Sequence, residues 1–253
     1  MKGTDGNTAL SARAPIVKKL TLDNRLKVCY TIITLRVMTE HQGDFSMEKH
    51  KFFEREILNI ESIDLQDFVR WFFDNHVGAW FFKSGASSSG KYHPEFAKGD
   101  GGLVRHTRAV EWVCEELLRM SSYAYMKAEY KDYARVACLL HDTCKYGGLE
   151  EDHDCYKVHG ELAADKVAFA WYEFFDGASC PELLMMAIRS HMGQWTENRE
   201  DRPFTNIDRL VHLSDYIASR PFWDIPELSS QYYEDTAQEI LDAPPVGMVD
   251  YPL

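Results

Sequence analysis

The stretch LLHDTCKYG, residues 139–147, ends an apolar run with a histidine and an aspartate side by side and places a lysine three positions after the aspartate. Burying a carboxylate is unfavourable unless it is paired with, or bound to, a positive charge. A core-facing helix that ends in His141 and Asp142 therefore indicates that these two side chains hold a metal ion. Their partners are expected on other helices that face the same core.

Helical periodicity dominates the chain after Met47 and predicts an all-α fold. Apolar residues recur at three- and four-residue spacing in MEKHKFFEREILNI and DLQDFVRWFFDNHVGAWFF. A long loop rich in glycine and serine follows at residues 83–102, and long ordered loops inside compact domains are often functional. Five further helices, separated by turn-forming breaks, are predicted at residues 103–120, 132–145, 159–176, 181–192 and 206–219.

The chain divides into three parts on this pattern: an N-terminal extension at residues 1–46, a helical domain at 47–220 and a C-terminal tail at 221–253. The extension contains LKVCYTIITLRV, residues 26–37, which is either a strand with no obvious partner or part of a disordered segment. The tail contains five prolines and is predicted to be irregular apart from a short helix near SSQYYEDTAQEILD. All candidate metal ligands lie after Met47.

Composition limits the classes of function. The 253 residues are 45% hydrophobic and carry a net charge of −12, which disfavours a broad grip on the phosphate backbone of nucleic acid. The six cysteines form no C-x-x-C pair, so we expect them to be reduced and mostly buried. There is neither an apolar run of about 18 residues nor a secretory signal, which predicts a cytoplasmic protein with no membrane partner.

Each of the five predicted helices carries one imidazole or carboxylate on its apolar face. His106, for example, shares helical spacing with Val110 and Val113. A single histidine of this kind is usually a core residue with a hydrogen-bond partner, but five helices with the same feature indicate a shared cation at the bundle centre. The ligand candidates from the five helices are His106, His141, His159, His191 and Asp215.

This set of imidazoles and carboxylates, with no thiolate pair, suits Mn, Fe, Co, Ni or Zn, and Mg is less expected. Asp142 has two oxygens and could bridge a second ion, whereas His141 can bind only one, so one or two ions are predicted. Lys145 lies within one helical turn of both residues. It is either a solvated lysine that the helix dipole stabilises, or a cation that meets a phosphate oxygen beside the metal.

These residues resemble the HD-domain superfamily of metal-dependent phosphohydrolases, whose pattern is a histidine, a later His-Asp doublet and a later aspartate. The counterparts here are His106 in GGLVRHT, the doublet His141–Asp142, and Asp215 in HLSDYIASR. The resemblance covers roughly residues 68–220. KYHPEFAKGDGGLVRHT is also similar to the branch that contains the YhaM-type exoribonucleases and HD relaxase-like proteins, although their nucleic-acid-binding β-barrel is not recognisable in residues 1–46.

The resemblance implies an HD helical bundle with a metal site at its centre. One ion would be held by His106, His141, Asp142 and Asp215, and a second by Asp142, His159 and His191. Two departures from the family pattern concern this site. Thr143–Cys144 follows the doublet where an Ile-Gly or Leu-Gly pair is common, and SHMG lacks the adjacent histidine of some two-metal members.

The expected chemistry is hydrolysis of a phosphoester by metal-activated water, with Asp142 holding the ions and Lys145 offsetting charge on the phosphate oxygens. His93, in the loop before the first ligand, is a candidate to contact the phosphate or to protonate the leaving group, and an exposed loop histidine is the competing explanation. Trp195 and Arg220 are further candidates for substrate binding, Trp195 by stacking on a base.

The leading hypothesis is a phosphohydrolase that acts on a small phosphorylated substrate of the nucleotide type. A 3′–5′ exonuclease or phosphodiesterase on nucleic acid is the second hypothesis, and a basic groove beside the site would favour it. The residues that would form this groove are Lys83, Lys91, Lys98, Arg105 and Arg108. Two further hypotheses are a non-catalytic nucleotide-binding HD module and a metal-dependent oxygenase, as in some diiron HD-domain proteins. The sequence does not determine the substrate, the metal or the oligomeric state.

Overall fold

The computed structural model describes residues 48–87, 93–152, 156–196, 199–222 and 225. All regular structure in these residues is helical apart from one isolated bridge between Gly147 and Glu151, which confirms the predicted all-α class. The predicted strand at residues 26–37 and the predicted short helix of the tail lie outside the described residues.

The first helices of the domain form an aromatic layer. The 3₁₀ helix η1 (Lys49–Phe53) continues into α2 (Glu54–Ile57), and α3 spans Ile63–His76. Ser62 caps α3, since its side chain accepts a hydrogen bond from the Leu65 backbone N–H at 3.4 Å. The short 3₁₀ helices η2 (Ala79–Phe82) and η3 (Glu95–Ala97) then lead to the main bundle. Buried phenylalanines, such as Phe53 stacked on Phe73 at 4.5 Å, hold this layer together.

The five helices predicted to carry the ligands are all present. They are α4 (Gly102–Leu118), α5 (Ala128–Leu140), α6 (His159–Phe174), α7 (Glu182–Ser190) and α8 (Asn206–Ala218). The short helices η5 (Gly193–Trp195) and η6 (Arg199–Asp201) lie between α7 and α8. A capping box of Thr205 and Asp208 fixes the start of α8.

The prediction was wrong about the ends of α5. The helix begins at Ala128 and stops at Leu140, whereas residues 132–145 were expected to be helical. After Leu140 the chain turns, because the Thr143 and Lys145 backbone N–H groups bond to the carbonyls of Leu140 and Asp142 three residues back. His141 is the C-cap of α5, and Asp142 and Lys145 lie in the turn that follows.

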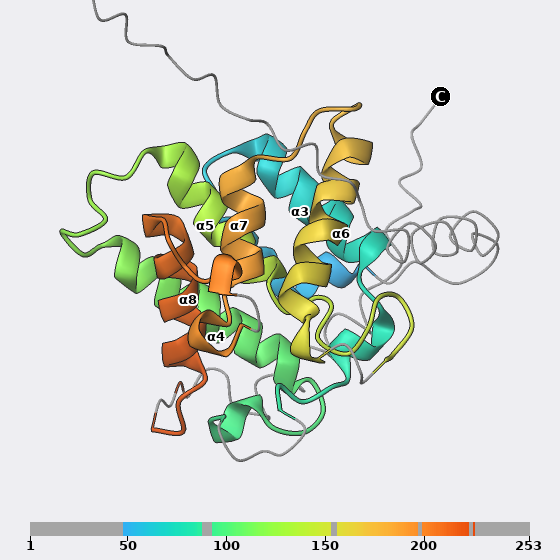
Figure 1. Ribbon diagram of the computed structural model, residues 1–253. Coiled ribbons are helices and arrows are strands. Elements are labelled where there is room, and N and C mark those ends of the chain that lie inside the picture. The colour runs from blue at the N-terminus through green and yellow to red at the C-terminus, as the bar shows by residue number, and fades with distance from the viewer. Residues whose placement is uncertain (1–47, 88–92, 153–155, 197–198, 223–224, 226–253) are drawn as a thin grey trace, which may run out of the picture. The chain divides into compact units, whose positions relative to one another are not determined.

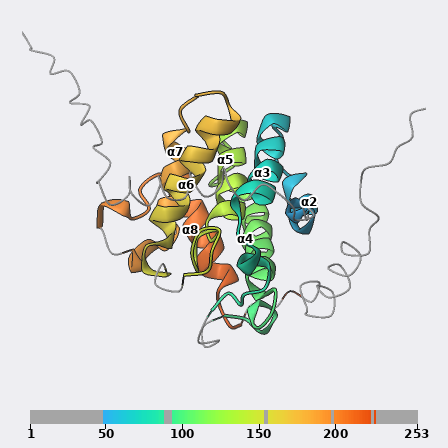
Figure 2. The ribbon, with the colours of Figure 1, turned by 90° about the vertical axis from the view of Figure 1, so that its right-hand side faces the viewer.

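Helix α5 lies in the middle of the bundle, where it packs against α3, α4, α7 and α8 (Figure 1). Figure 2 shows α3 on one side of α5 and α7 on the other. Helix α4 packs along α8, and α6 along α7. The C-terminal ends of α5 and α7, the start of α6, the N-terminal half of α4 and the C-terminal half of α8 meet around one point in the core.

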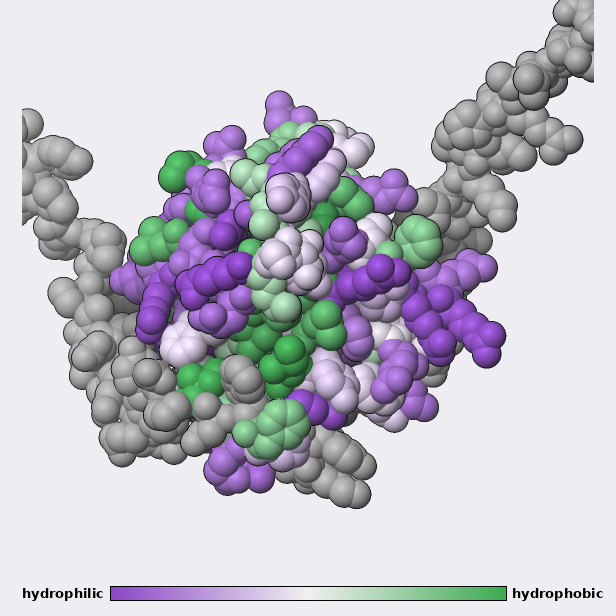
Figure 3. Space-filling view, turned by 90° about the vertical axis from the view of Figure 1, so that its left-hand side faces the viewer, coloured by the Kyte–Doolittle hydropathy of each residue, from purple (hydrophilic) through white to green (hydrophobic). Residues whose placement is uncertain are grey.

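Polar side chains cover most of the face in Figure 3, around an area of hydrophobic residues in its lower middle. No helix in the described ranges is long and apolar enough to cross a membrane. The described cysteines, Cys114, Cys138, Cys144 and Cys180, are all free thiols, and the first three are buried.

Candidate metal centre

Six side chains from five helices converge at the bundle centre, as predicted. They are His106 in α4, His141 and Asp142 at the end of α5, His159 at the start of α6, His191 at the C-cap of α7 and Asp215 in α8. The Asp215 side chain is 21% exposed, while the other five side chains are at most 5% exposed. The centre is thus enclosed on all sides except the one that Asp215 faces.

Asp142 separates the histidines into two groups, one for each carboxylate oxygen. Its Oδ2 lies 3.4 Å from His141 Nε2 and 3.7 Å from His106 Nε2. Asp215 Oδ1 adds to this group, at 3.1 Å from His106 Nε2. On the other side, Asp142 Oδ1 lies 3.0 Å from His159 Nε2 and 3.6 Å from His191 Nε2.

The distances among the donor atoms give the same two groups, except that His141 belongs to both. The donors of His106, His141 and Asp215 lie within 4.8 Å of one another, and so do those of His141, Asp142 and His191. His141 therefore stands between the two groups. The donor set has the residue types and spacing for a two-cation site with Asp142 as the shared ligand.

Three of the histidines are oriented by the same local contact. Nδ1 of His141, His159 and His191 lies 2.6–2.8 Å from the carbonyl oxygen of the residue three positions earlier, which is Cys138, Tyr156 and Ile188 respectively. A carbonyl can only accept, so Nδ1 must carry the hydrogen. The other ring nitrogen, Nε2, is then the one that faces Asp142, as metal-binding histidines require.

The pair His159 and His191 shows why this arrangement needs a positive charge. Their Nε2 atoms lie 2.9 Å apart. Burial lowers the pKa of His191 to about 4, so this ring is neutral near pH 7 and its Nε2 carries a lone pair. Two ring nitrogens can lie this close only when a proton or a metal ion lies between them. The same two nitrogens face the Asp142 carboxylate, and its negative charge further favours a cation at this point.

Unpartnered buried atoms support the fit to a metal. Among the described residues, both ring nitrogens of His106, His141 Nε2 and Asp142 Oδ1 are buried without a hydrogen-bond partner. Buried polar atoms are nearly always paired, and a cluster of exceptions on converging side chains indicates an additional ligand. The residues present therefore fit the one or two divalent cations that the sequence predicted, and the identity of the metal is not determined by them.

Electrostatics keep the acids of the centre ionised. Burial alone would raise the pKa of Asp142, but Lys145 and His141 outweigh it and hold this pKa well below its ordinary value. Burial would also raise the pKa of Asp215, but the nearby His106 outweighs it and lowers this pKa. Burial would lower the pKa of His141, but the Asp142 carboxylate outweighs burial, so this pKa is raised. A metal ion that binds to His141 Nε2 would displace the proton that the raised pKa favours there.

Lys145 lies at the edge of the centre. Its Nζ is 2.5 Å from Asp142 Oδ2, and its side chain is 16% exposed. Burial lowers the pKa of Lys145, but Asp142 and Asp215 outweigh this effect and raise it, so the side chain is an ammonium ion. The structure thus shows an ion-paired lysine at the metal centre, and the explanation as a solvated lysine does not hold.

His93 packs against the first ligand. Its ring centroid lies 5.1 Å from that of His106, edge to face, and its Nδ1 is buried without a hydrogen-bond partner in the described residues. Burial and the nearby His106 and Lys145 lower the pKa of His93 to about 3. His93 is thus a neutral imidazole beside the centre and not an exposed loop residue.

The two remaining sequence candidates meet on a residue that the sequence did not single out. Trp195 stacks on Tyr216, with ring centroids 5.9 Å apart and planes at 15°. The Arg220 guanidinium lies over the same Tyr216 ring, 4.3 Å from its centroid. Tyr216 directly follows the ligand Asp215. We call Trp195, Tyr216 and Arg220 the aromatic platform.

Three more residues that sequence reasoning missed shape the centre. A Cβ on Gly160 would lie 3.2 Å from the His191 ring, so glycine there lets α6 approach α7 closely. Gly193 has a φ of +60°, and a Cβ there would lie 2.1 Å from the His212 ring. His212 Nδ1 in turn donates to the His191 carbonyl at 2.8 Å. The glycine two residues after His191 in SHMGQW was the available sequence signal.

The arginines proposed for a basic groove are used elsewhere. Arg105 donates to the backbone carbonyls of Phe96 and Lys98, and Arg108 donates to Glu56 at 2.9 Å. Both arginines are buried, and Lys98 pairs with Glu95. Lys91 lies outside the described residues, and Lys83 is exposed. These contacts remove the two strongest cations of the groove from any role in binding a polyanion.

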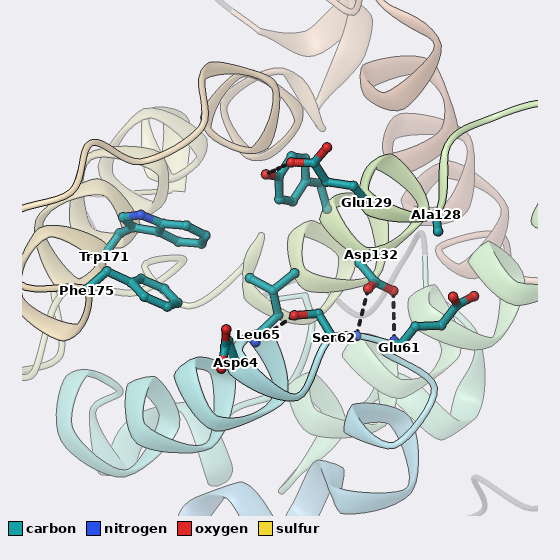
Figure 4. A pocket seen from close by; sticks show the side chains of 10 residues that line it. Glu61, Ser62, Asp64, Leu65, Ala128, Glu129, Asp132, Trp171 and Phe175 are labelled. Atoms are coloured by element: carbon teal, nitrogen blue, oxygen red, sulfur yellow. Dashed lines mark hydrogen bonds between the residues drawn. The ribbon is translucent and has the colours of Figure 1, made fainter.

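A surface pocket of about 480 Å³ lies far from the centre (Figure 4). It is lined by the start of α3, the start of α5 and the end of α6. Asp132 points into it, but its oxygens accept hydrogen bonds from the Glu61 and Ser62 backbone N–H groups. Glu129 and the ligand His141 are separated by about 18 Å of helical rise along α5, so the pocket is not part of the metal centre.

The fold and the site together define a helical bundle with a buried cluster of histidines and aspartates that could hold a metal ion. A comparison with protein families is consistent with this class: the family model described as HD domain matches residues 103–220, which include every candidate ligand. Residues 103–220 are therefore similar to HD domains, which are generally metal-dependent phosphohydrolases. Comparisons with curated proteins and with solved structures gave no significant match.

Proposed function

We propose that the HD domain is a metal-dependent phosphohydrolase that cleaves a phosphoester of a small, nucleotide-type substrate. The observation that carries the proposal is the two-sided arrangement around Asp142, in which imidazole Nε2 atoms from four helices face the two carboxylate oxygens. A structural ion pair does not require four buried imidazoles around one acid, whereas a metal site does.

The residues divide the work of hydrolysis. Divalent cations at the centre would polarise the phosphoryl oxygens and lower the pKa of a coordinated water. Asp142 and the histidines fix the position of the cations. The Lys145 ammonium, held at the open edge by Asp142, offsets negative charge on a phosphate oxygen. As the new P–O bond forms, the bond to the leaving oxygen breaks. His93, whose ring packs against His106, would contact the phosphate or relay a proton to that oxygen.

A small substrate is favoured over a nucleic-acid strand. The chain has a net charge of −12, and the two arginines that would line a basic groove are buried in other contacts. A phosphodiesterase or exonuclease acting on nucleic acid is therefore the second candidate. The relationship to a particular HD branch remains a prediction. So do the cytoplasmic location and the division of the chain into residues 1–46, 47–220 and 221–253.

The test starts with elemental analysis of the purified full chain, followed by a hydrolysis screen. The screen contains 5′-nucleotides, ribose 5-phosphate, bis(p-nitrophenyl) phosphate and short oligonucleotides. We expect bound transition metal and hydrolysis of at least one small phosphoester. His141→Asn should lose both, while His50→Asn, a matched histidine that bonds Asp74 far from the centre, should keep both.

The remaining outcomes separate the competing functions. Hydrolysis of oligonucleotides in preference to nucleotides would favour the phosphodiesterase. Nucleotide binding without any hydrolysis would make the domain a non-catalytic module. A product that forms only in the presence of oxygen would indicate oxygenase chemistry.

A further inference from the structure

The aromatic platform lies beside the open side of the metal centre. Trp195 is 51% exposed and Tyr216 36% exposed, although each presents a large ring to its neighbour. Arg220 adds a guanidinium over the Tyr216 ring. Exposed rings flanked by a cation offer a flat surface on which another planar ring can stack.

The platform is fixed to two ligands by short connections. Tyr216 is the residue after Asp215, so their Cα atoms are about 3.8 Å apart. Trp195 lies four residues after His191. His212, one helical turn before Tyr216, holds the His191 carbonyl at 2.8 Å. The positive φ of Gly193 turns the chain between His191 and Trp195 so that the indole returns to α8.

The direction of access matches this position. Asp215 is the one ligand with appreciable exposure, so the centre opens along α8. Adjacent residues of a helix point about 100° apart, which places the Tyr216 ring at the side of this opening and not within the centre. A phosphate at the cations would thus have its attached group next to the platform.

We propose that the platform binds the planar heteroaromatic ring of the substrate, a nucleobase, while its phosphate lies at the metal centre. This proposal rests on the proposed function for the position of the phosphate. It assigns Tyr216, with Trp195 and Arg220, as the residues that select substrates carrying a ring. If the three side chains instead only pack on one another at the surface, ligands with and without a ring bind alike.

Calorimetry on the purified full chain with its own metal tests the proposal without requiring turnover. The probes are 5′-AMP and ribose 5-phosphate, which share the phosphate and the sugar and differ in the base. Stacking of one base corresponds to a gain in affinity of about 5- to 150-fold, so 5′-AMP should bind more tightly than ribose 5-phosphate by a factor in this range. Trp195→Ala and Tyr216→Leu should each reduce this ratio several-fold. Tyr125→Ala removes a ring that is 96% exposed in the α4–α5 connection and should keep the ratio.

Each result decides the matter. Equal affinities for the two probes, no binding of 5′-AMP at millimolar concentration, or a ratio that survives in both variants would overturn the platform as a base-binding site. The hydrolysis screen judges the proposed function separately. A preference for 5′-AMP that depends on Tyr216, in a protein that hydrolyses nothing, would retain the platform and reject the enzyme.

Discussion

Helix α5 has a buried aspartate near each end, and the two are neutralised in different ways. Near the start, Asp132 accepts hydrogen bonds from the Glu61 and Ser62 backbone N–H groups at 3.0 and 2.9 Å and from Arg135 at 2.8 Å (Figure 4). Just past the other end, Asp142 has one ammonium group, from Lys145, and is otherwise surrounded by imidazole nitrogens. Backbone and guanidinium donors surround the first acid, whereas one ammonium group and four imidazole nitrogens surround the second.

Two further buried acids at the Asp132 side of the bundle show how a fold neutralises a carboxylate without a metal. Glu56 accepts from the Arg108 guanidinium and the Trp112 indole. Glu111 is neutralised by a proton, because burial raises its pKa to about 8. The buried acids on the Asp132 side are thus neutralised by arginine or by a proton. Asp142, on the other side, is the acid that requires a bound metal cation. A buried acid indicates a functional site when imidazole nitrogens from several helices converge on it.

Exchanging the aspartates for asparagine should separate the two ends most strongly. Asp142→Asn removes the shared ligand, so we expect the metal content to fall to a trace. Turnover should drop by at least about 10³-fold, since metal ions contribute several kcal/mol to such reactions. Asp132→Asn breaks a buried ion pair and should lower the free energy of unfolding by about 3–5 kcal/mol while the folded protein keeps its metal. Elemental analysis and urea unfolding measure both, and metal loss in Asp132→Asn alone would reverse the comparison.

Lys145→Met tests the cation at the edge of the centre. If the ammonium stabilises charge in the transition state, turnover should fall by about 10²–10³-fold, which corresponds to about 2.7–4 kcal/mol. The metal-loaded variant should keep its metal and its melting temperature, because the metal ions still neutralise Asp142. Lys127→Met, an exposed lysine at the start of α5, is the matched control. A loss of less than about fivefold in Lys145→Met would remove the catalytic role.

Gly193→Ala tests how the chain after α7 supports the centre. The positive φ and the contact with the His212 ring should together lower stability by about 1–3 kcal/mol. Because His212 holds the His191 carbonyl, we also expect metal affinity to fall by about 10–100-fold, as for other residues that orient a ligand. Gly148→Ala is the control, since a Cβ there meets nothing within 4 Å. Equal metal affinity in the two variants would show that His212 does not position His191.

Glu111→Gln should leave the metal centre unchanged and alter only the pH dependence of stability. The pKa of Glu111 is raised to about 8, so between the ordinary value near 4.3 and this value the folded state binds one more proton than the unfolded state. The stability that Glu111 contributes is complete below about pH 4.3 and is lost, by at most about 1.4 kcal/mol per pH unit, as the pH rises through about 8. Glu111→Gln should flatten this decline in urea unfolding at about pH 5 to 8. The exposed Glu116→Gln should keep the wild-type decline.

The fold and the ligand set were predictable because both depend on local periodicity. The 3.6-residue spacing predicts the five helices, and the same spacing shows which histidine of each helix faces the core. The end of α5 was not predictable in this way, since the turn after Leu140 depends on bonds that compete with the helix. Gly193 and His212 were missed because their contact joins segments far apart in the chain. The burial of Arg108 was missed for the same reason: its partner Glu56 lies 52 residues earlier.

The central claim is that Asp142 bridges two cation sites, and anomalous scattering from crystals grown with saturating Mn²⁺ tests it most directly. The account predicts two peaks about 3.5–4 Å apart, the separation common to two-metal sites. One should lie near His106, His141 and Asp215, and the other near His159 and His191. A single peak would reduce the centre to one ion, and no peak within coordination distance of Asp142 would contradict the account.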